Sequence, residues 1–158
     1  MRIAGIDPGQ TGAIAIMERD GTLVDVYDMP VLSDGKRKIV DGHEILRILD
    51  NEDVDTVYLE KAQTMPGQGI SSSGHYMKGA GIIEGILIAL GTAYELIHPA
   101  TWKRAVMRDM PKEKEASVIK VRQLYPEYEG LTHKKHHGRA DAILIAYYGV
   151  KWEKWGES

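Results

Sequence analysis

The sequence predicts an α/β domain in which a mixed, five-stranded sheet is flanked by helices. Three short apolar segments come first, at residues 2–6, 12–18 and 22–29, and an Asp20-Gly21 turn separates the last two. Such a pattern is typical of an antiparallel meander. Two later strands alternate with helices, so we expect three antiparallel strands followed by two parallel ones.

Each later element has its own local signal, such as a capping residue, a helical apolar face or a cluster of Gly, Pro and Ser. In chain order these elements are a polar loop at 34–38, a helix at 41–51 capped by Asp41, a strand at 55–59, a loop at 63–73, a helix at 74–90, a strand at 93–97, a helix at 101–107 capped by Thr101, a helix from Pro111 to about Leu124 and a last helix at about 139–150. No repeat or linker divides the chain. We therefore expect one domain over residues 1–150 and a C-terminal tail over 151–158.

Composition sets limits on the class of protein. The chain has 158 residues and no Cys, which excludes disulfides and thiolate chemistry. The N-terminus lacks the pattern of a signal peptide, and the longest apolar run, residues 82–90, is interrupted by Glu84 and Gly85. These features predict a cytoplasmic protein that does not insert into a membrane.

The charge is unevenly distributed. The net charge is −3, but residues 1–98 hold 8 Lys+Arg against 15 Asp+Glu, whereas residues 99–158 hold 12 against 8. The tract 133–139 contains no acid at all. A basic face can therefore exist on an acidic protein, although charge alone agrees equally with an ordinary solvated surface.

Two acids end apolar strands. Asp7 follows the first strand and opens a Gly-rich turn, and Glu60 ends the strand at 55–59. In open α/β sheets the ligand site lies beyond the carboxyl ends of the strands. Asp141 lies in the first turn of the last helix, and His137, four residues earlier, is on the same helical face.

Three neighbouring carboxylates would raise one another's pKa, and divalent cations remove that penalty. Oxygen ligands suit Mg²⁺ or Mn²⁺, and two such ions form the clamp used for displacement at phosphorus. Each acid also has a simpler interpretation: Asp7 as a turn former, Glu60 as an exposed strand end and Asp141 as a partner of the helix dipole. The three together favour the metal site.

An ordered set of motifs resembles the RuvC-type Holliday junction resolvases, in particular their divergent phage-encoded branch. The motifs are Gly5-Ile6-Asp7-Pro8-Gly9, Leu59-Glu60-Lys61, residues 65–72, Pro99-Ala100-Thr101-Trp102-Lys103 and Gly138-Arg139-Ala140-Asp141-Ala142. The resemblance covers the chain to about Gly149. It implies a ribonuclease H-like fold, a homodimer and a metal-dependent nuclease.

The resemblance also implies four metal-binding, catalytic positions: Asp7, Glu60, Asp141 and one residue shortly before Asp141. In the family that residue is usually three positions earlier, where this chain has Gly138. We assign His137 instead, with His136 as the alternative. The implied cofactors are two Mg²⁺ ions per site, with Mn²⁺ as a substitute.

A wider set of polar, basic and Gly residues is expected to contact DNA. Gln63 stands where family members carry a base-stacking aromatic, and Lys61 is equally a phosphate contact or a surface charge. The set comprises Lys61, Gln63, Gly67, Gln68, Ser71, Ser72, Ser73, Lys103, Lys134, Lys135 and Arg139.

The resulting hypothesis is an endonuclease that resolves four-way DNA junctions by paired nicks, leaving 5′-phosphate and 3′-hydroxyl ends. One alternative keeps the chemistry and changes the substrate to flaps, forks or three-way DNA. Less favoured alternatives are a fragment of an actin-like ATPase, whose first phosphate loop resembles residues 7–12, and a DNA-binding module without catalysis.

Overall fold

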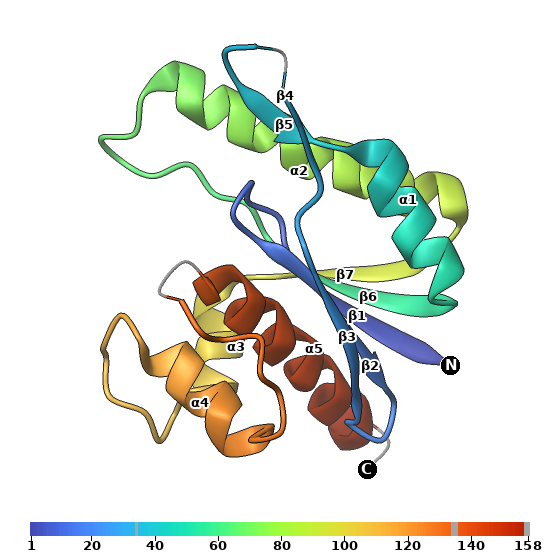
Figure 1. Cartoon of the computed structure of the whole chain (residues 1–158), viewed down its shortest axis with the longest axis vertical. Helices are drawn as coiled ribbons and strands as arrows, with labels where there is room; N and C mark the ends of the chain where they lie inside the picture. Colours follow the sequence, from blue (N-terminus) through green and yellow to red (C-terminus); the bar gives the residue numbers. More distant parts are fainter. Residues whose placement is uncertain (34, 134–135, 157–158) are drawn as a thin grey trace.

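The computed structural model describes residues 1–33, 35–133 and 136–156. Its elements are β1 (Arg2–Asp7), β2 (Ala13–Glu18), β3 (Leu23–Asp28), β4 (Val31–Ser33), β5 (Lys38–Val40), α1 (Gly42–Asn51), β6 (Val54–Glu60), α2 (Ile70–Leu90), β7 (Ala93–Ile97), α3 (Pro99–Val106), α4 (Ala116–Leu124) and α5 (His137–Gly156). Figure 1 shows these elements as a central sheet with helices on both faces.

The central sheet has the predicted composition. Its strand order is β3-β2-β1-β6-β7. The pairs β1–β2 and β2–β3 are antiparallel, and β1–β6 and β6–β7 are parallel. The expected five-stranded mixed sheet is thus confirmed.

Two apolar clusters cover the two faces of this sheet. Ile6 and Leu59 belong to the cluster that packs under α1 and α2. Tyr58 belongs to the other cluster, with α3, α4 and α5. Because side chains alternate along a strand, this division fixes which face each functional side chain occupies.

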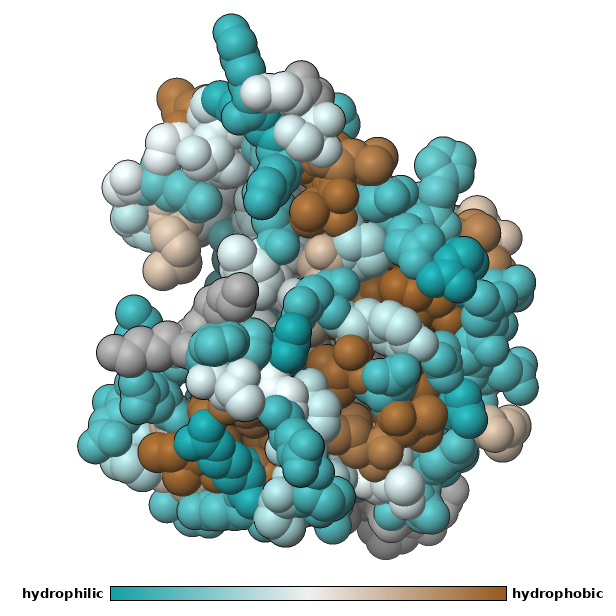
Figure 2. Space-filling view, in the orientation of Figure 1, coloured by the Kyte–Doolittle hydropathy of each residue, from teal (hydrophilic) through white to brown (hydrophobic). Residues whose placement is uncertain are grey.

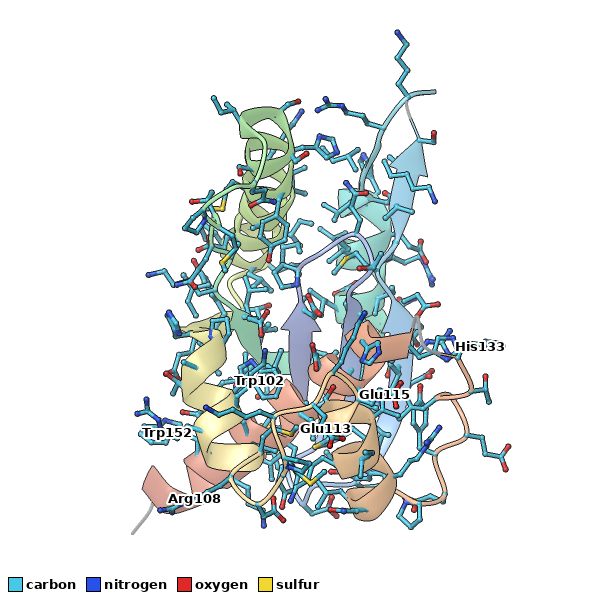
Figure 3. The ribbon with its side chains drawn as sticks, turned by 90° about the vertical axis from the view of Figure 1, so that its left-hand side faces the viewer. Trp102, Arg108, Glu113, Glu115, His133 and Trp152 are labelled. Carbon is cyan, nitrogen blue, oxygen red and sulfur yellow. The ribbon has the colours of Figure 1, made fainter. Side chains whose placement is uncertain are left out.

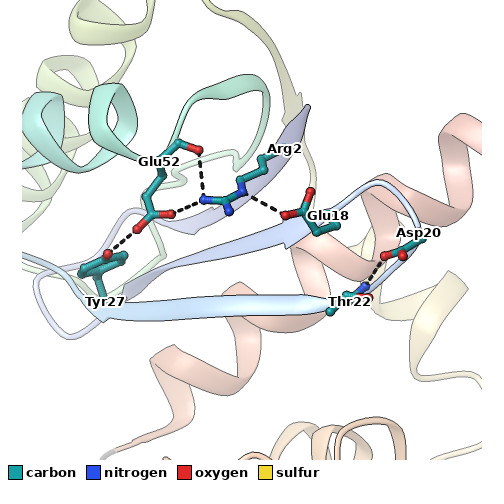
Figure 4. Close-up of polar contacts among 6 residues, drawn as sticks. All are labelled: Arg2, Glu18, Asp20, Thr22, Tyr27 and Glu52. Atoms are coloured by element: carbon teal, nitrogen blue, oxygen red, sulfur yellow. Dashed lines mark hydrogen bonds and ion pairs between the residues drawn. The ribbon is translucent and has the colours of Figure 1, made fainter.

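A network of polar side chains joins neighbouring elements at the end of the sheet opposite the carboxyl ends of β1 and β6 (Figure 4). Arg2 donates from Nε to Glu18 at 3.0 Å and from Nη1 to Glu52 at 2.7 Å. Tyr27 donates its hydroxyl to the other oxygen of Glu52 at 2.5 Å. Glu52 therefore joins β1 and β3 to the end of α1.

Several predicted boundaries were wrong. The predicted polar loop at 34–38 overlaps a strand, because Lys38 is the first residue of β5, which pairs with β4 in a separate hairpin; residue 34 lies outside the described residues. The helix predicted from Gly74 begins at Ile70, so Ser71, Ser72 and Ser73 lie in its first turn and not in a loop. Nothing in the sequence marks this earlier start, because Gly and Ser residues weaken a helical pattern without preventing a first turn.

Three further helix limits differ as well. α3 begins at Pro99 with His98 as its cap, whose Nδ1 accepts a hydrogen bond from the Ala100 amide, so Thr101 is not the cap. α4 begins at Ala116, five residues after Pro111. α5 runs to Gly156, past the expected end near Val150. Across the described part of the chain, no helix combines the length and apolarity needed to cross a membrane.

Candidate active site

Strand register brings the first two acids together. Ile6 of β1 pairs with Leu59 of β6 in parallel, so Asp7 and Glu60 follow at the same edge of the sheet. Ile6 and Leu59 both face α1 and α2. By alternation, Asp7 and Glu60 face the opposite side, where α5 lies.

A glycine in β1 brings the third acid to them. A Cβ on Gly5 would lie only 2.3 Å from the Ala146 nitrogen and 2.4 Å from the Ala142 oxygen. Only glycine lets α5 approach β1 this closely. Asp141, next to Ala142, is thereby held on the face of the sheet that Asp7 occupies.

The three carboxyl groups influence one another electrostatically. Burial and the negative charge of Asp7 raise the pKa of Asp141 to about 7. Burial raises the pKa of Glu60 and of Asp7, and the charge of Asp7 raises that of Glu60 further. The charge of Asp7 thus acts on both Glu60 and Asp141 at the carboxyl end of the sheet.

Two residues of α3 stabilise the charged forms. Trp102, fully buried, donates from Nε1 to Glu60 Oε2 at 2.6 Å. Lys103 lies with its ammonium 5.5 Å from the Trp102 ring centre, and its positive charge lowers the pKa of all three acids. Figure 3 shows Trp102 between α3 and the ends of the strands.

Sequence reasoning missed the roles of three side chains at this site. Trp102 belongs to the buried core, but nothing in the sequence marks its hydrogen bond to Glu60, and none of the expected site residues was Tyr76 or Ser117. Burial and the charges of Asp7 and Glu60 raise the pKa of Tyr76, on α2, to about 12. A hydrogen bond from Ser117, on α4, lowers the pKa of Asp141. No local motif marks these contacts, because each partner comes from a different element.

Gly138 stands where the family resemblance places a ligand. A Cβ at this residue would lie 2.1 Å from the Thr11 carbonyl oxygen. Since the turn after β1 already fills that space, the usual family position cannot carry a side chain here. His137, at the start of α5, lines the same cavity as Asp141.

The alternative residue, His136, has a different environment. It is buried, with 7% of its surface exposed. Its Nδ1 accepts a hydrogen bond from the His133 amide at 3.2 Å, and its ring lies edge-on to that of His133. These contacts favour His137 over His136 as a ligand.

The donor chemistry fits a hard divalent cation. Neighbouring carboxylates that raise one another's pKa are stabilised when such an ion neutralises them. Among residues 1–33, 35–133 and 136–156, however, no three His, Asp or Glu side chains are close enough to ligate one ion together. Mg²⁺ is compatible with this spacing, because it usually keeps several waters and takes one or two carboxylates plus substrate phosphates.

A basic groove leads to the acids between α3 and α4. We call this cavity, of about 960 Å³, the α3–α4 groove. His137 and Asp141 lie in its wall, and Glu113 is the other acid there. Its cations are Lys103, Arg104, Arg108, Lys112 and Lys114. Of these cations, Lys103 belongs to the set predicted above to contact DNA. Lys112 and Lys114 were not predicted, because acids alternate with cations along residues 109–115 of the sequence.

The loop between β6 and α2 and the first turn of α2 together carry most of the residues predicted to contact DNA. Lys61, Gln63, Gly67, Gln68, Ser71 and Ser72 are exposed, and Ser73 is half-buried. Gln63 Nε2 lies 2.7 Å from His98 Nε2, and Gln68 Oε1 accepts a hydrogen bond from the Met65 amide. Gly67 has a φ of +84°, a conformation that glycine adopts without strain.

The basic residues predicted near Asp141 have a different outcome. Arg139 forms a bidentate ion pair with Asp28, at 2.6 and 2.8 Å, and donates to the Gly130 carbonyl. Through these contacts Arg139 holds α5 against β3. Because its guanidinium is already paired, this arrangement counts against the predicted contact of Arg139 with DNA. Lys134 and Lys135 lie outside the described residues.

The fold of this chain is that of the RuvC-type resolvases. It matches Thermus thermophilus RuvC, solved in complex with a Holliday junction substrate, with a TM-score of 0.70 and 16% identity over 99% of this chain and 96% of that one. It also matches the fowlpox virus Holliday junction resolvase, with a TM-score of 0.56 and 17% identity over 98% and 99% of the two chains.

Sequence comparison gives a relative of the same kind. The chain is 33% identical over 94 residues to the chloroplastic Holliday junction resolvase MOC1 of Chlamydomonas reinhardtii. The match covers 59% of this chain and 11% of that protein, so the chain spans only a small part of its curated relative. No family model matches.

Proposed function

We propose that the chain is a metal-dependent endonuclease that resolves four-way DNA junctions. The observation that carries this proposal is the convergence of Asp7, Glu60 and Asp141 at the carboxyl end of a RuvC-type sheet. Five cations line the groove that leads to these acids, as a polyanionic substrate requires. The resemblance to resolvases in sequence and fold supports the four-way junction as the substrate.

In this proposal Asp7, Glu60, His137 and Asp141 hold two Mg²⁺ ions, or Mn²⁺ in their place. When bound, the ions supply an activated water and charge stabilisation at the scissile phosphate. Trp102 fixes the orientation of Glu60 through its 2.6 Å hydrogen bond. Lys103 balances the negative charge of the acids before the phosphate arrives.

His137 is also suited to move a proton. An imidazole nitrogen that does not hold a metal ion can accept or donate a proton, and this residue lines the groove beside Asp141. It would accept a proton from the attacking water or supply one to the leaving 3′ oxygen. The expected products carry 5′-phosphate and 3′-hydroxyl ends.

A cleavage assay on matched DNA substrates tests this function. Four-way, three-way, flap, fork and linear DNA of equal length are incubated with the purified chain, with and without Mg²⁺. We expect Mg²⁺-dependent, symmetric nicks in four-way DNA and much slower cutting of linear DNA. Equal cutting of flaps or forks would indicate a general branched-DNA nuclease.

The same assay distinguishes the remaining alternatives. DNA binding without any nicking in Mg²⁺ or Mn²⁺ would indicate a non-catalytic module. ATP hydrolysis without nicking would indicate the actin-like alternative.

We infer that the active form is a homodimer, since paired nicks require two sites. Exposed apolar side chains on α2, including Met77 at 42% and Ile88 at 67%, support an interface on this helix. Light scattering at several protein concentrations would measure the mass in solution, and a monomer throughout would contradict this inference.

A further inference from the structure

A second cleft lies on the other side of the Asp7 turn. We call this cavity, of about 550 Å³, the hairpin cleft. Its walls come from the turn at Gly9–Thr11, from the first turns of α2 and from residues 36–38 at the β4–β5 hairpin. Figure 2 shows hydrophilic side chains at the top of the molecule, where the hairpin lies.

Contacts to one carbonyl group join the three walls. Gln10 donates from Nε2 to the Lys38 carbonyl oxygen at 2.6 Å. His75 also contacts this oxygen through Nε2, and because a carbonyl only accepts, the ring must donate. The hairpin is therefore fixed to the turn that follows Asp7 and to α2.

The cleft has the chemistry of a polyanion site. Lys36, Arg37 and Lys38 are consecutive, exposed cations. The other side chains in the walls carry no negative charge, and those of Gln10, Ser72 and Tyr76 each have an N–H or O–H group that can donate a hydrogen bond. Among the described residues that line the cleft there is no acid.

Its position relates it to the active site. Gly9 lines the cleft, and its amide donates to Asp7 Oδ1 at 3.2 Å. Tyr76, another lining residue, is close enough to Asp7 and Glu60 for their charges to raise its pKa. The α3–α4 groove reaches the acids beside Asp141, and the hairpin cleft reaches them beside Asp7.

We propose that the hairpin cleft binds the phosphates of the cut DNA strand next to the scissile phosphate, with Lys36, Arg37 and Lys38 as their cationic partners. This proposal rests on the proposed nuclease function. It adds a binding element that the sequence did not suggest, because residues 34–38 read as an ordinary polar loop. The cut strand would then pass from the α3–α4 groove, across the acids, into the hairpin cleft.

The first test measures affinity for four-way DNA and its dependence on salt, in Ca²⁺ so that the DNA stays intact. Lys36→Ala and Arg37→Ala should each weaken binding and reduce the slope of log K against log salt concentration by about 1. The control is Arg47→Ala, which removes an exposed cation that pairs with Glu44 on α1, away from the cleft. Slopes equal to that of the wild type in both cleft variants would overturn the proposal.

The second test locates the phosphates. Single methylphosphonates, which lack the negative charge, replace phosphates on either side of the cut in the cleaved strand. A methylphosphonate on one side of the cut should weaken DNA binding by the wild type. It should weaken binding by Lys36→Ala less, because this variant has already lost its contact with that phosphate. Equal effects in wild type and variant at every tested position would contradict placement of the cut strand in the cleft.

These outcomes are separate from the test of the nuclease itself. Absence of Mg²⁺-dependent nicking by the wild type would reject the proposed function whatever the affinities are. Normal nicking by the wild type, with unchanged salt slopes in the cleft variants, would reject only the role of the hairpin cleft.

Discussion

Trp102 Nε1 donates a 2.6 Å hydrogen bond to Glu60 Oε2, which joins the buried ring of α3 to the carboxylate that ends β6. This bond holds one oxygen of Glu60 and leaves the other for a ligand. Partners that orient a metal-binding carboxylate commonly affect metal affinity or activity by about 10- to 100-fold.

Trp102→Phe is therefore predicted to reduce Mg²⁺-dependent nicking by about 10- to 100-fold, with a higher Mg²⁺ requirement. The measurement is the nicking rate over a series of Mg²⁺ concentrations. Trp152→Phe is the matched control, because Trp152 is 48% exposed and stacks on Tyr148. An unchanged Mg²⁺ requirement in Trp102→Phe would show that the hydrogen bond has no influence on the site.

Asp141 predicts a pH dependence of stability in the metal-free protein. Its folded pKa is about 7, against an ordinary value of 3.8. Between these values the folded state keeps a proton that the unfolded chain has lost, so stability falls as pH rises from about 4 to 7. Thermal unfolding in EDTA should show this fall.

Asp141→Asn should flatten the same pH profile. The variant should be more stable than the wild type at pH 8, since it removes a buried charge beside Asp7 and Glu60. Near pH 4 the two proteins should differ little. A wild-type melting temperature that rises steadily from pH 4 to 8 in EDTA would contradict the raised pKa.

Gly138→Ala tests the close contact at the start of α5. The new Cβ would lie 2.1 Å from the Thr11 carbonyl oxygen, so the turn after Asp7 or the helix must shift. We expect the free energy of unfolding to fall by about 1–3 kcal/mol or more, together with a loss of nicking.

The matched control for that variant is Gly81→Ala, at an exposed position of α2 where a Cβ meets nothing within 4 Å, with both variants compared at a protein concentration at which the chain is monomeric. It should gain about 0.5–1 kcal/mol, because alanine favours a helix over glycine. Equal effects of the two substitutions on unfolding in urea would mean that residue 138 has room for a side chain.

Glu52→Ala should destabilise the fold without changing the site. It removes the partner of Arg2 and Tyr27 at the far end of the sheet, which should cost about 1–3 kcal/mol. Nicking at a temperature where the variant is folded should equal that of the wild type. A large loss of nicking by the folded variant would indicate that the two ends of the sheet are coupled.

The sequence predicted those features that depend on local pattern. Asp7 and Glu60 follow apolar strands, and β-strand register alone then brings them together. The β4–β5 hairpin was missed because its strands have only three residues each, too few for a periodic signal. The contacts of Trp102, Tyr76 and Ser117 were missed because they depend on how separate elements pack.

Gly138 is a residue that the sequence marks as unusual but does not explain. The sequence shows that a glycine stands where the family usually has a ligand, but not why. The reason is that the Thr11 carbonyl lies close to the start of α5. These residues are more than 120 positions apart in the sequence, so the contact exists only in the folded chain.

The most direct test of the central claim is Mg²⁺-dependent nicking of four-way DNA by Asp7→Asn, measured beside junction binding. Asp50→Asn, an exposed acid of α1, serves as the control and should match the wild type in both. We predict that Asp7→Asn binds the junction with near wild-type affinity and does not nick it. Nicking by Asp7→Asn at the wild-type rate would contradict a catalytic site built on this carboxylate.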